Sequence, residues 1–233
     1  MPGTSNRLLH ALRDEDRRAV TERAQRVRLS RGDLLIDIGA PLSHVWFPEG
    51  AVVSAVAAYE NGDIMEMATV GREGCTGIEP LLGADRVVVR YLAQVDGEAL
   101  MLPTAMFHEI VATRWRFESM LRGYALAFMY QLMISSACNG SHSLEERLSR
   151  WLLNMDDRSD LSAMPLTHEF LAEMLGVQRP SLSKAAKALQ DRRLISYGRG
   201  AVEIRNRKGL ERASCECYRQ VKNAYKSLIV STA

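Results

Sequence analysis

The sequence predicts an α+β fold: an N-terminal antiparallel β-barrel of jelly-roll-like form, then a long dimerisation helix, then a C-terminal winged helix-turn-helix domain. Turn signals recur about every ten residues from 27 to 102, which is the spacing of a sandwich or barrel. A helical pattern without proline follows, and two shorter helical patterns joined by a glycine precede a β-hairpin. The expected domains are 1–114, the long helix with a hinge at 115–140, and 141–233.

The expected strands of the first region are separated by turn-forming residues. β-branched runs at 52–56 and 87–89 suit strands. Asn61-Gly62 lies between two such segments and indicates a tight hairpin. Pro48 marks a strand end or an edge position, because proline cannot donate a hydrogen bond to a neighbouring strand.

The long helix is predicted from residues 106–139, which contain no proline and a single glycine. Apolar and small side chains recur there at alternating steps of four and three, the spacing of a coiled-coil seam. We expect this seam to pair with the same helix of a second subunit, forming a homodimer. The alternative is a helix that packs only on the β-domain of its own chain. The expected dimer interface consists of Leu121, Tyr124, Ala125, Phe128, Leu132 and Ser135.

A hinge and a new helix are expected after the long helix. The segment 139–142 interrupts the helical pattern. Ser143, followed three residues later by Glu146, has the spacing of a capping box, which starts a helix.

Two short helices joined by a tight turn are predicted over 167–191. Thr167 is a good N-cap, and Gly176 easily takes the left-handed conformation that the turn requires. Pro180 falls in the first turn of the second helix, where its missing N–H costs nothing. The outward face of that helix carries cations and hydroxyls, with no acid before Asp191. Such a face suits phosphates and guanine edges.

A β-wing is expected after the second helix, because short strands at 194–197 and 201–204 flank a basic glycine-rich turn. The second helix, about 179–191, is the expected recognition helix, and it would enter the major groove of double-stranded DNA. The residues expected to contact DNA are Thr167, Gln178, Arg179, Pro180, Ser181, Ser183, Lys184, Lys187 and Arg199.

The charge distribution agrees with this division. Residues 165–233 carry 13 Lys and Arg against 6 Asp and Glu, a net charge of +7, whereas residues 1–164 carry 17 against 22, a net charge of −5. A basic C-terminal third favours a polyanionic partner. No apolar run approaches the roughly 18 residues of a membrane span, and the first residues lack a secretory pattern. Four scattered cysteines form no disulfide framework, so we expect a cytoplasmic, reduced protein.

The segment from Leu166 to Lys184 resembles the helix-turn-helix of the Crp/Fnr superfamily of bacterial regulators, and residues 144–153 resemble the first helix of that family's DNA-binding domain. The resemblance implies a cyclic-nucleotide-binding-like barrel and a homodimeric transcription regulator that binds a palindromic promoter site and RNA polymerase. Arg179 matches the family arginine that opens the recognition helix. Pro180 stands where many members have a base-reading glutamate, and Lys184 replaces a frequent arginine, so a different target sequence is expected.

An effector site is the least specific part of the resemblance. Members that bind cyclic nucleotides carry a Gly-Glu pair and, shortly after it, an arginine followed by a small residue. The matching places here are Gly77, Glu79, Arg86 and Arg90, but neither the spacing nor the residues after the arginines agree. We therefore expect an unidentified small-molecule effector other than cAMP, and no required cofactor.

Metal binding and catalysis are not expected from the sequence. Cys215 and Cys217 form a close pair, but two thiolates do not complete a tetrahedral zinc site, and no histidine is clustered beside them in the sequence. Cys138 and His142 are four residues apart and resemble a nucleophile with its base, but no third, orienting group is evident. The remaining alternative to a DNA reader is a signalling module whose winged helix binds protein.

Overall fold

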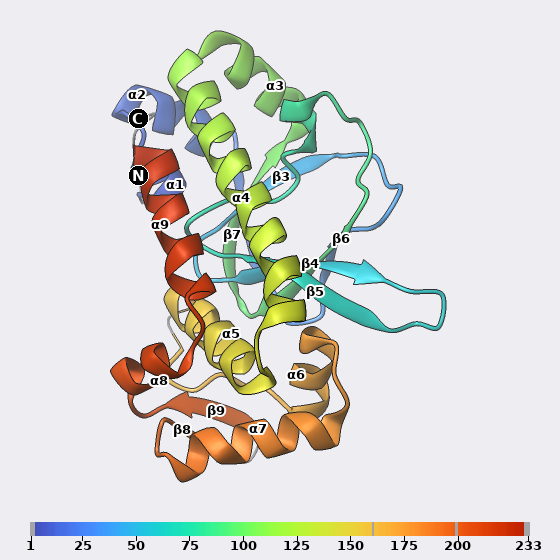
Figure 1. Ribbon diagram of the computed structural model, residues 1–233. Helices are drawn as coiled ribbons and strands as arrows, with labels where there is room; N and C mark the ends of the chain where they lie inside the picture. The colour runs from blue at the N-terminus through green and yellow to red at the C-terminus, as the bar shows by residue number, and fades with distance from the viewer. Residues whose placement is uncertain (1–2, 160, 199, 231–233) are drawn as a thin grey trace.

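The computed structural model describes residues 3–159, 161–198 and 200–230. A β-domain lies on one side of a long helix, a C-terminal helical domain lies beneath it, and the last helix runs beside the long helix (Figure 1). Two short helices, α1 (Arg7–His10) and α2 (Asp14–Thr21), precede the first strand. None of the described helices has both the length and the apolarity that a membrane span requires.

The β-domain consists, in the described residues, of two antiparallel sheets that face each other. The first has the order β1-β7-β3 and the second the order β2-β6-β4-β5. Their interior is filled by residues that alternate inward, among them Val45, Phe47 and Leu102, none of which is exposed. The strands are β1 (Gln25–Leu29), β2 (Leu34–Ile36), β3 (His44–Pro48), β4 (Val52–Ala58), β5 (Ile64–Val70), β6 (Arg90–Val95) and β7 (Gly97–Pro103), with a 3-10 turn, η1 (Glu79–Leu82).

The hairpin predicted at Asn61-Gly62 is confirmed, because β4 pairs with β5 and Gly62 has φ +90°. The predicted antiparallel, jelly-roll-like β-domain is also confirmed, and in the described residues its two sheets are not joined into a closed barrel. In the described residues, isolated bridges such as Trp46–Thr76 and Pro41–Arg86 extend the strand pairing beyond the sheets.

The long helical pattern is divided in two. Helix α3 (Thr104–Thr113) ends at Arg114, whose φ of −125° and ψ of 81° interrupt the helix, and α4 (Trp115–Ser141) follows at once. The expected hinge at 139–142 begins later than predicted, since the helix continues to Ser141 and His142 takes the extended conformation. The capped helix predicted after it is confirmed: Ser143 and Glu146 form both hydrogen bonds of a capping box at the start of α5 (Leu144–Arg158).

Helix α9 (Cys217–Val230) supplies a cover for α4 that the sequence analysis missed. The two helices lie side by side in opposite directions (Figure 1). The ring of Tyr225 lies 6.0 Å from that of Tyr124, and Val221 and Ile229 join the core of the β-domain.

The stripe of α4 predicted as a dimer interface therefore lies largely inside the protomer. Leu132 is partly buried, and the other five residues of the stripe are buried by their own chain: Leu121, Tyr124, Ala125, Phe128 and Ser135. The alternative interpretation, packing within the chain, describes this stripe correctly, although α9 contributes as well as the β-domain. The outward face of α4 is a different stripe, in which Leu126, Met129 and Met133 are half exposed.

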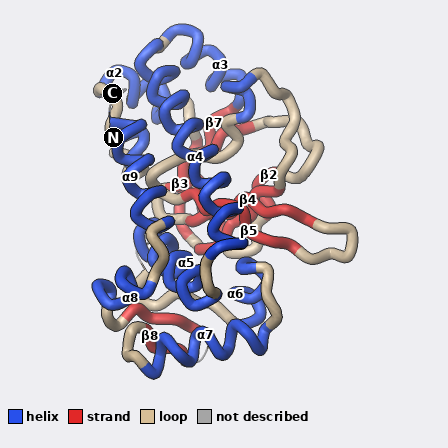
Figure 2. The backbone as a smooth tube through the Cα atoms, in the orientation of Figure 1, coloured by secondary structure: helices blue, strands red, loops and turns tan. Residues whose placement is uncertain are grey.

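The C-terminal domain has its own apolar core, to which Leu148, Leu182 and Leu210 contribute fully buried side chains. Its elements after α5 are α6 (His168–Leu175), α7 (Arg179–Asp191), β8 (Ile195–Gly198), β9 (Ala201–Ile204) and α8 (Arg207–Ala213). Figure 2 shows α7 on the outer side of this domain, next to the β8–β9 hairpin. The order of two helices and a hairpin is that of a winged helix.

Candidate nucleic-acid interface

The turn between α6 and α7 is built by the residues that predicted it. Thr167 Oγ1 accepts a hydrogen bond from the Phe170 N–H at 3.2 Å, which caps α6. Gly176 ends α6 in the left-handed region, with φ +63° and ψ +45°, and Val177 packs against the domain core. Helix α7 begins at Arg179, with Pro180 in its first turn. These predictions from local sequence are confirmed.

The outward face of α7 carries most of the side chains that we expected at DNA. Gln178, Arg179, Pro180 and Ser181 are exposed where the helix begins, and Lys184 and Lys187 are exposed further along it. Lys187 pairs with Asp191 at 3.2 Å, and both side chains are largely in water. Within the described part of the chain, Lys184 makes no hydrogen bond or ion pair. The face is therefore cationic over its first two turns.

Arg179 is held by an acid from the preceding helix. Its Nη1 lies 2.9 Å from Glu169 Oε1, with about two thirds of each side chain exposed. An ion pair so exposed contributes on the order of 0–1 kcal/mol. The guanidinium can therefore exchange Glu169 for a base edge or a phosphate at little cost.

Ser183 differs from the others because it is partly buried and already bonded. Its Oγ lies 2.9 Å from Nδ1 of His168, and the His168 ring stacks on Tyr197 of the wing with 4.2 Å between centroids. Burial, followed by the charge of Arg179, lowers the pKa of His168. A neutral His168 thus joins α6, α7 and β8, and Ser183 fixes this junction. Sequence reasoning missed His168 and Glu169, since only the tertiary structure brings them to α7.

The predicted wing is confirmed as a hairpin, with Ile195 opposite Ile204 and Gly198 opposite Ala201. Arg199, expected at its tip, lies outside the described residues.

A hairpin of the β-domain approaches the start of the recognition helix. A groove of about 900 Å³ separates the β4–β5 hairpin, represented by Tyr59 and Asp63, from Gln178 and Ser181. At Gly176 the contact is close, because a Cβ atom there would lie 2.6 Å from Met65 Sδ. The β-domain therefore contacts the turn that sets the angle of α7.

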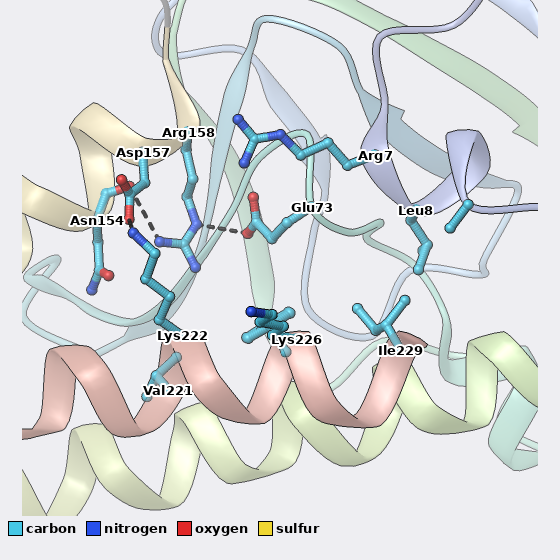
Figure 3. A pocket seen from close by; sticks show the side chains of 12 residues that line it. Arg7, Leu8, Glu73, Asn154, Asp157, Arg158, Val221, Lys222, Lys226 and Ile229 are labelled. Atoms are coloured by element: carbon cyan, nitrogen blue, oxygen red, sulfur yellow. Dashed lines mark hydrogen bonds and ion pairs between the residues drawn. The ribbon is translucent and has the colours of Figure 1, made fainter. Parts of the chain in front are cut away.

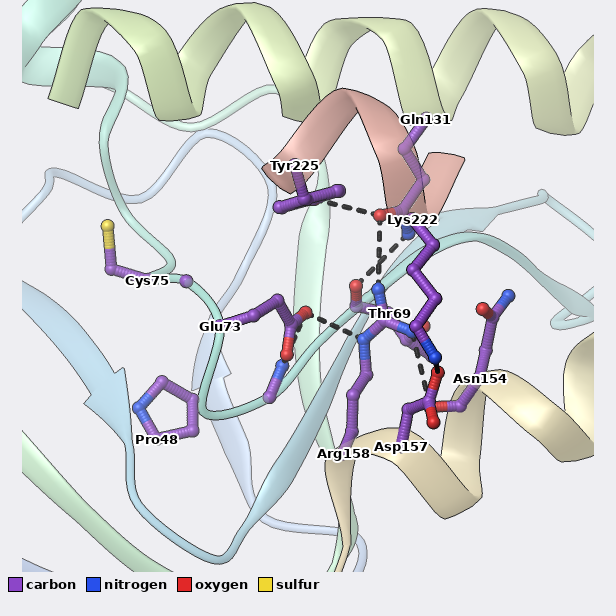
Figure 4. Close-up of polar contacts among 12 residues, drawn as sticks. Pro48, Thr69, Glu73, Cys75, Gln131, Asn154, Asp157, Arg158, Lys222 and Tyr225 are labelled. Atoms are coloured by element: carbon purple, nitrogen blue, oxygen red, sulfur yellow. Dashed lines mark hydrogen bonds and ion pairs between the residues drawn. The ribbon is translucent and has the colours of Figure 1, made fainter. Parts of the chain in front are cut away.

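A buried ionic network joins the β-domain, α4, α5 and α9 (Figure 4). Arg158 donates from Nε to Glu73 Oε1 at 2.6 Å and from Nη2 to Gln131 Oε1 at 3.3 Å. Tyr225 donates its hydroxyl to the same Gln131 oxygen at 2.8 Å. Burial opposes the charge on Arg158, but the nearby Glu73 carboxylate favours it, and the pKa of Arg158 is raised, so the guanidinium stays charged. One cation thus connects four elements.

Beside this network lies a pocket of about 370 Å³ between α1, α5 and α9 (Figure 3). Leu8, Val221 and Ile229 form its apolar wall, and Arg7 and Lys226 add positive charge. Glu73 and Asp157 also line the pocket, so its polar side carries charges of both signs.

The residues expected at an effector lie elsewhere in the β-domain. Glu79 accepts a hydrogen bond from the Tyr91 hydroxyl at 3.1 Å, and burial raises its pKa. Arg90 pairs with Asp37 at 2.8 Å, and Arg86 donates to the Gly39 carbonyl at 2.7 Å. Gly77 is left-handed, with φ +74°. None of the four predicted residues lines the groove or the pocket described above.

Three of the four cysteines and a histidine converge where α4 meets the start of α9. Cys138, His142, Cys215 and Cys217 place their ligand atoms within 4.8 Å of one another. From the sequence we expected no histidine near the Cys215–Cys217 pair, and for that reason no metal site. The structure contradicts that reason, because His142 and Cys138 lie beside the pair. Sequence spacing could not reveal the cluster, because 72 residues of the chain lie between His142 and Cys215.

Comparison with known proteins agrees with this geometry. Residues 146–213 match the family model of the Crp-like helix-turn-helix domain. A search of curated proteins found no match to the chain. Solved structures with a similar fold include FixK2 from Bradyrhizobium japonicum, which has a TM-score of 0.70 and 16% identity over 82% of this chain and 98% of that one.

Two further structures extend the comparison. A putative transcriptional regulator of the Crp/Fnr family from Eubacterium rectale has a TM-score of 0.68 and 14% identity over 88% of this chain and 96% of that one. The c-di-GMP-responsive regulator CLP from Xanthomonas campestris has a TM-score of 0.59 and 14% identity over 82% and 99%. The C-terminal domain thus has the winged-helix fold. More specifically, residues 146–213 match a Crp-like helix-turn-helix domain, and the chain has a fold similar to that of Crp/Fnr regulators.

Proposed function

We propose that this chain is a dimeric, sequence-specific transcription regulator that inserts α7 into the major groove of DNA. The observation that carries the proposal is the outward face of α7, on which Arg179, Ser181, Lys184 and Lys187 are exposed and no acid precedes Asp191. The match to a Crp-like helix-turn-helix supports it. The regulator would act in the cytoplasm with RNA polymerase, under control of an effector other than cAMP.

The side chains of α7 divide into two roles. Arg179 is the base reader, since a guanidinium presents two parallel donors to the edge of a guanine. Lys184 and Lys187 are point charges that neutralise phosphates. Pro180 offers an apolar surface in place of a polar side chain, which suits the methyl group of a thymine.

Dimerisation is proposed through the exposed stripe of α4. Arg122, Leu126, Met129 and Met133 are exposed at steps of four, three and four residues, which is the spacing of a coiled-coil seam. Pairing of two α4 helices there would cover apolar surface that the protomer leaves in water, while α9 stays on the opposite face. Two recognition helices would then read half-sites about 34–36 Å apart.

Salt-dependent DNA binding tests the proposed role of α7. Fluorescence anisotropy with a genomic promoter fragment would compare wild type, Lys184→Glu and the matched control Arg28→Glu, an equally charge-reversing change on the exposed side of β1. We expect Lys184→Glu to abolish binding and Lys184→Ala to reduce the salt slope by about 1. Arg28→Glu should bind as wild type does. Equal binding by both charge reversals would contradict the proposal and favour a winged helix that binds protein.

A further inference from the structure

Four potential metal ligands from two distant parts of the chain meet at the junction of α4, α5 and α9. Cys138 and His142 come from the last turn of α4 and the residue after it, and Cys215 and Cys217 come from the segment that starts α9. The cysteines are buried and His142 is half-buried. None of them belongs to the DNA-facing surface of α7.

We propose that Cys138, His142, Cys215 and Cys217 form a tetrahedral binding site for a single zinc-class divalent cation. Three thiolates and one imidazole are a ligand set that proteins use for structural zinc. The site would fasten the end of α4 to the start of α9 at the hinge before the winged helix.

The distances fit a mononuclear site. Bonds of about 2.3 Å to sulfur and about 2.0–2.1 Å to nitrogen place tetrahedral ligand atoms roughly 3.4–3.8 Å apart. The Sγ atoms of Cys138 and Cys215 are 3.5 Å apart, and Cys217 Sγ lies 3.7 Å from Nδ1 of His142. All four ligand atoms lie within 4.8 Å of one another. The ligand set is therefore more compact than that of an iron–sulfur cluster, in which each thiolate binds a different iron atom.

The surroundings of His142 orient it as a ligand. Its Nε2 lies 3.3 Å from the Glu216 carboxylate, while Nδ1 faces the thiols. A carboxylate that accepts the second ring N–H fixes the tautomer and increases the basicity of the nitrogen that binds metal. Glu216 comes from between the two cysteines of its own segment, so one short segment supplies two ligands and the group that orients a third.

The charge of the site is also balanced. Three thiolates around a divalent cation leave a net charge of −1, which burial would disfavour without a counter-charge. Arg150 is buried and acts electrostatically on each of the three cysteines. Within the described residues its Nε has no hydrogen-bond partner, so the guanidinium is available to compensate the bound metal.

Metal titration of the full-length protein tests the proposal without DNA. Protein purified under reducing conditions would be stripped with a chelator and titrated with Co²⁺ and then Zn²⁺. We expect one Co²⁺ per chain, with the intense visible ligand-field bands of tetrahedral cobalt and thiolate-to-metal charge transfer in the near ultraviolet. Zn²⁺ should displace it, and elemental analysis of untreated protein should find one zinc per chain.

Variants separate the site from other cysteines. Cys217→Ser should remove the charge-transfer bands or weaken binding at least tenfold, and Glu216→Gln should weaken it about 10–100-fold. The control Cys75→Ser changes a buried thiol of the β-domain and should retain full stoichiometry. Circular dichroism would check that each variant folds.

Several outcomes would overturn the assignment. They are wild-type protein that binds no cobalt, a weak octahedral spectrum, or equal loss of binding in Cys75→Ser. Mass spectrometry that finds a Cys138–Cys215 disulfide in the protein as isolated, with no metal, would assign the cluster to thiol oxidation instead. Because the readout is metal content, its failure leaves the proposed DNA reading untouched.

Discussion

Replacing Arg158 with methionine should strongly destabilise the protein, because Arg158 is the cation that joins four elements. The change leaves the aliphatic part of the side chain in place, beside Gly71, but removes the guanidinium. Glu73 then loses its ion-pair partner, and Gln131 loses one of two donors to its oxygen. Breaking a buried ion pair by removing one partner typically costs about 3–5 kcal/mol.

The structure places the expected cost at the low end of that range. The Glu73 side chain is 18% exposed, and its Oε1 also accepts the Gly71 N–H at 3.2 Å, so the abandoned carboxylate keeps some solvation and one hydrogen bond. We therefore expect Arg158→Met to cost about 3 kcal/mol of unfolding free energy. For a chain of this size, that corresponds to a fall in Tm of about 6–12 °C.

Thermal and urea unfolding would measure this effect, with Arg205→Met as a matched control. Arg205 pairs with Glu203 of β9 at 2.8 Å, but its side chain is 55% exposed, so its loss should change the free energy of unfolding by no more than about 0.5 kcal/mol. Adding Glu73→Gln to Arg158→Met removes the unpaired charge and should restore part of the stability. The reasoning is refuted if Arg158→Met lies within 1 kcal/mol of wild type, roughly the value of an exposed pair, or if the double variant is no more stable than the single one.

Three further changes test other parts of the account. Leu126→Glu on the exposed stripe of α4 should convert the proposed dimer to monomer in analytical ultracentrifugation, and wild type sedimenting as a monomer would contradict that interface. Gly176→Ala should lower Tm by a few degrees, because an alanine in the left-handed conformation costs on the order of 1–2 kcal/mol and its Cβ would displace the Met65 side chain. An unchanged Tm would show that the turn tolerates a side chain. Burial raises the pKa of Glu66 in the folded state, so its contribution to stability is present at acidic pH and is lost as pH rises through the folded pKa. Glu66→Gln keeps an acceptor for the Trp151 N–H and should remove that decline in urea unfolding between acidic and neutral pH, whereas an unaltered pH profile would assign the decline to other groups.

Features fixed by a few neighbouring residues could be predicted from the sequence. The Thr167 cap, the left-handed Gly176 and the hairpin at Asn61-Gly62 depend on backbone geometry that one or two side chains determine. The outward face of α7 was also predictable, because helical periodicity separates its cations from its buried leucines. These features define the winged helix and the β-domain.

The features that the sequence did not reveal depend on contacts between distant segments. The apolar pattern of α4 predicts that a helix face is covered, but the same pattern suits a second subunit and a C-terminal helix of the same chain. Here α9 covers the stripe that contains Tyr124, which moves the proposed dimer surface to the stripe that contains Met129. Periodicity alone cannot identify the partner of an apolar stripe.

The metal-ligand cluster escaped sequence analysis for the same reason. Cys138 with His142 has helical spacing, and Cys215 with Cys217 has the spacing of a short extended segment, so each pair alone is half of a ligand set. Helix α9 runs back along α4, and this brings the two pairs of ligands together (Figure 1). Spacing rules detect a ligand set that lies within one segment of sequence, but not one that is completed only when two distant segments meet in the fold.

Selection of bound sites from genomic DNA, by wild type and by Arg179→Ala, tests the central claim most directly. If α7 reads bases from a two-fold symmetric dimer, sequences enriched by wild type will contain inverted half-sites about 34–36 Å apart. Arg179→Ala will lose preference at one base pair of each half-site, with a cost of about 1–3 kcal/mol. Enrichment of the same base at every position by both proteins would contradict the assignment of Arg179 as a base reader, and no enrichment by wild type would contradict sequence-specific DNA binding itself.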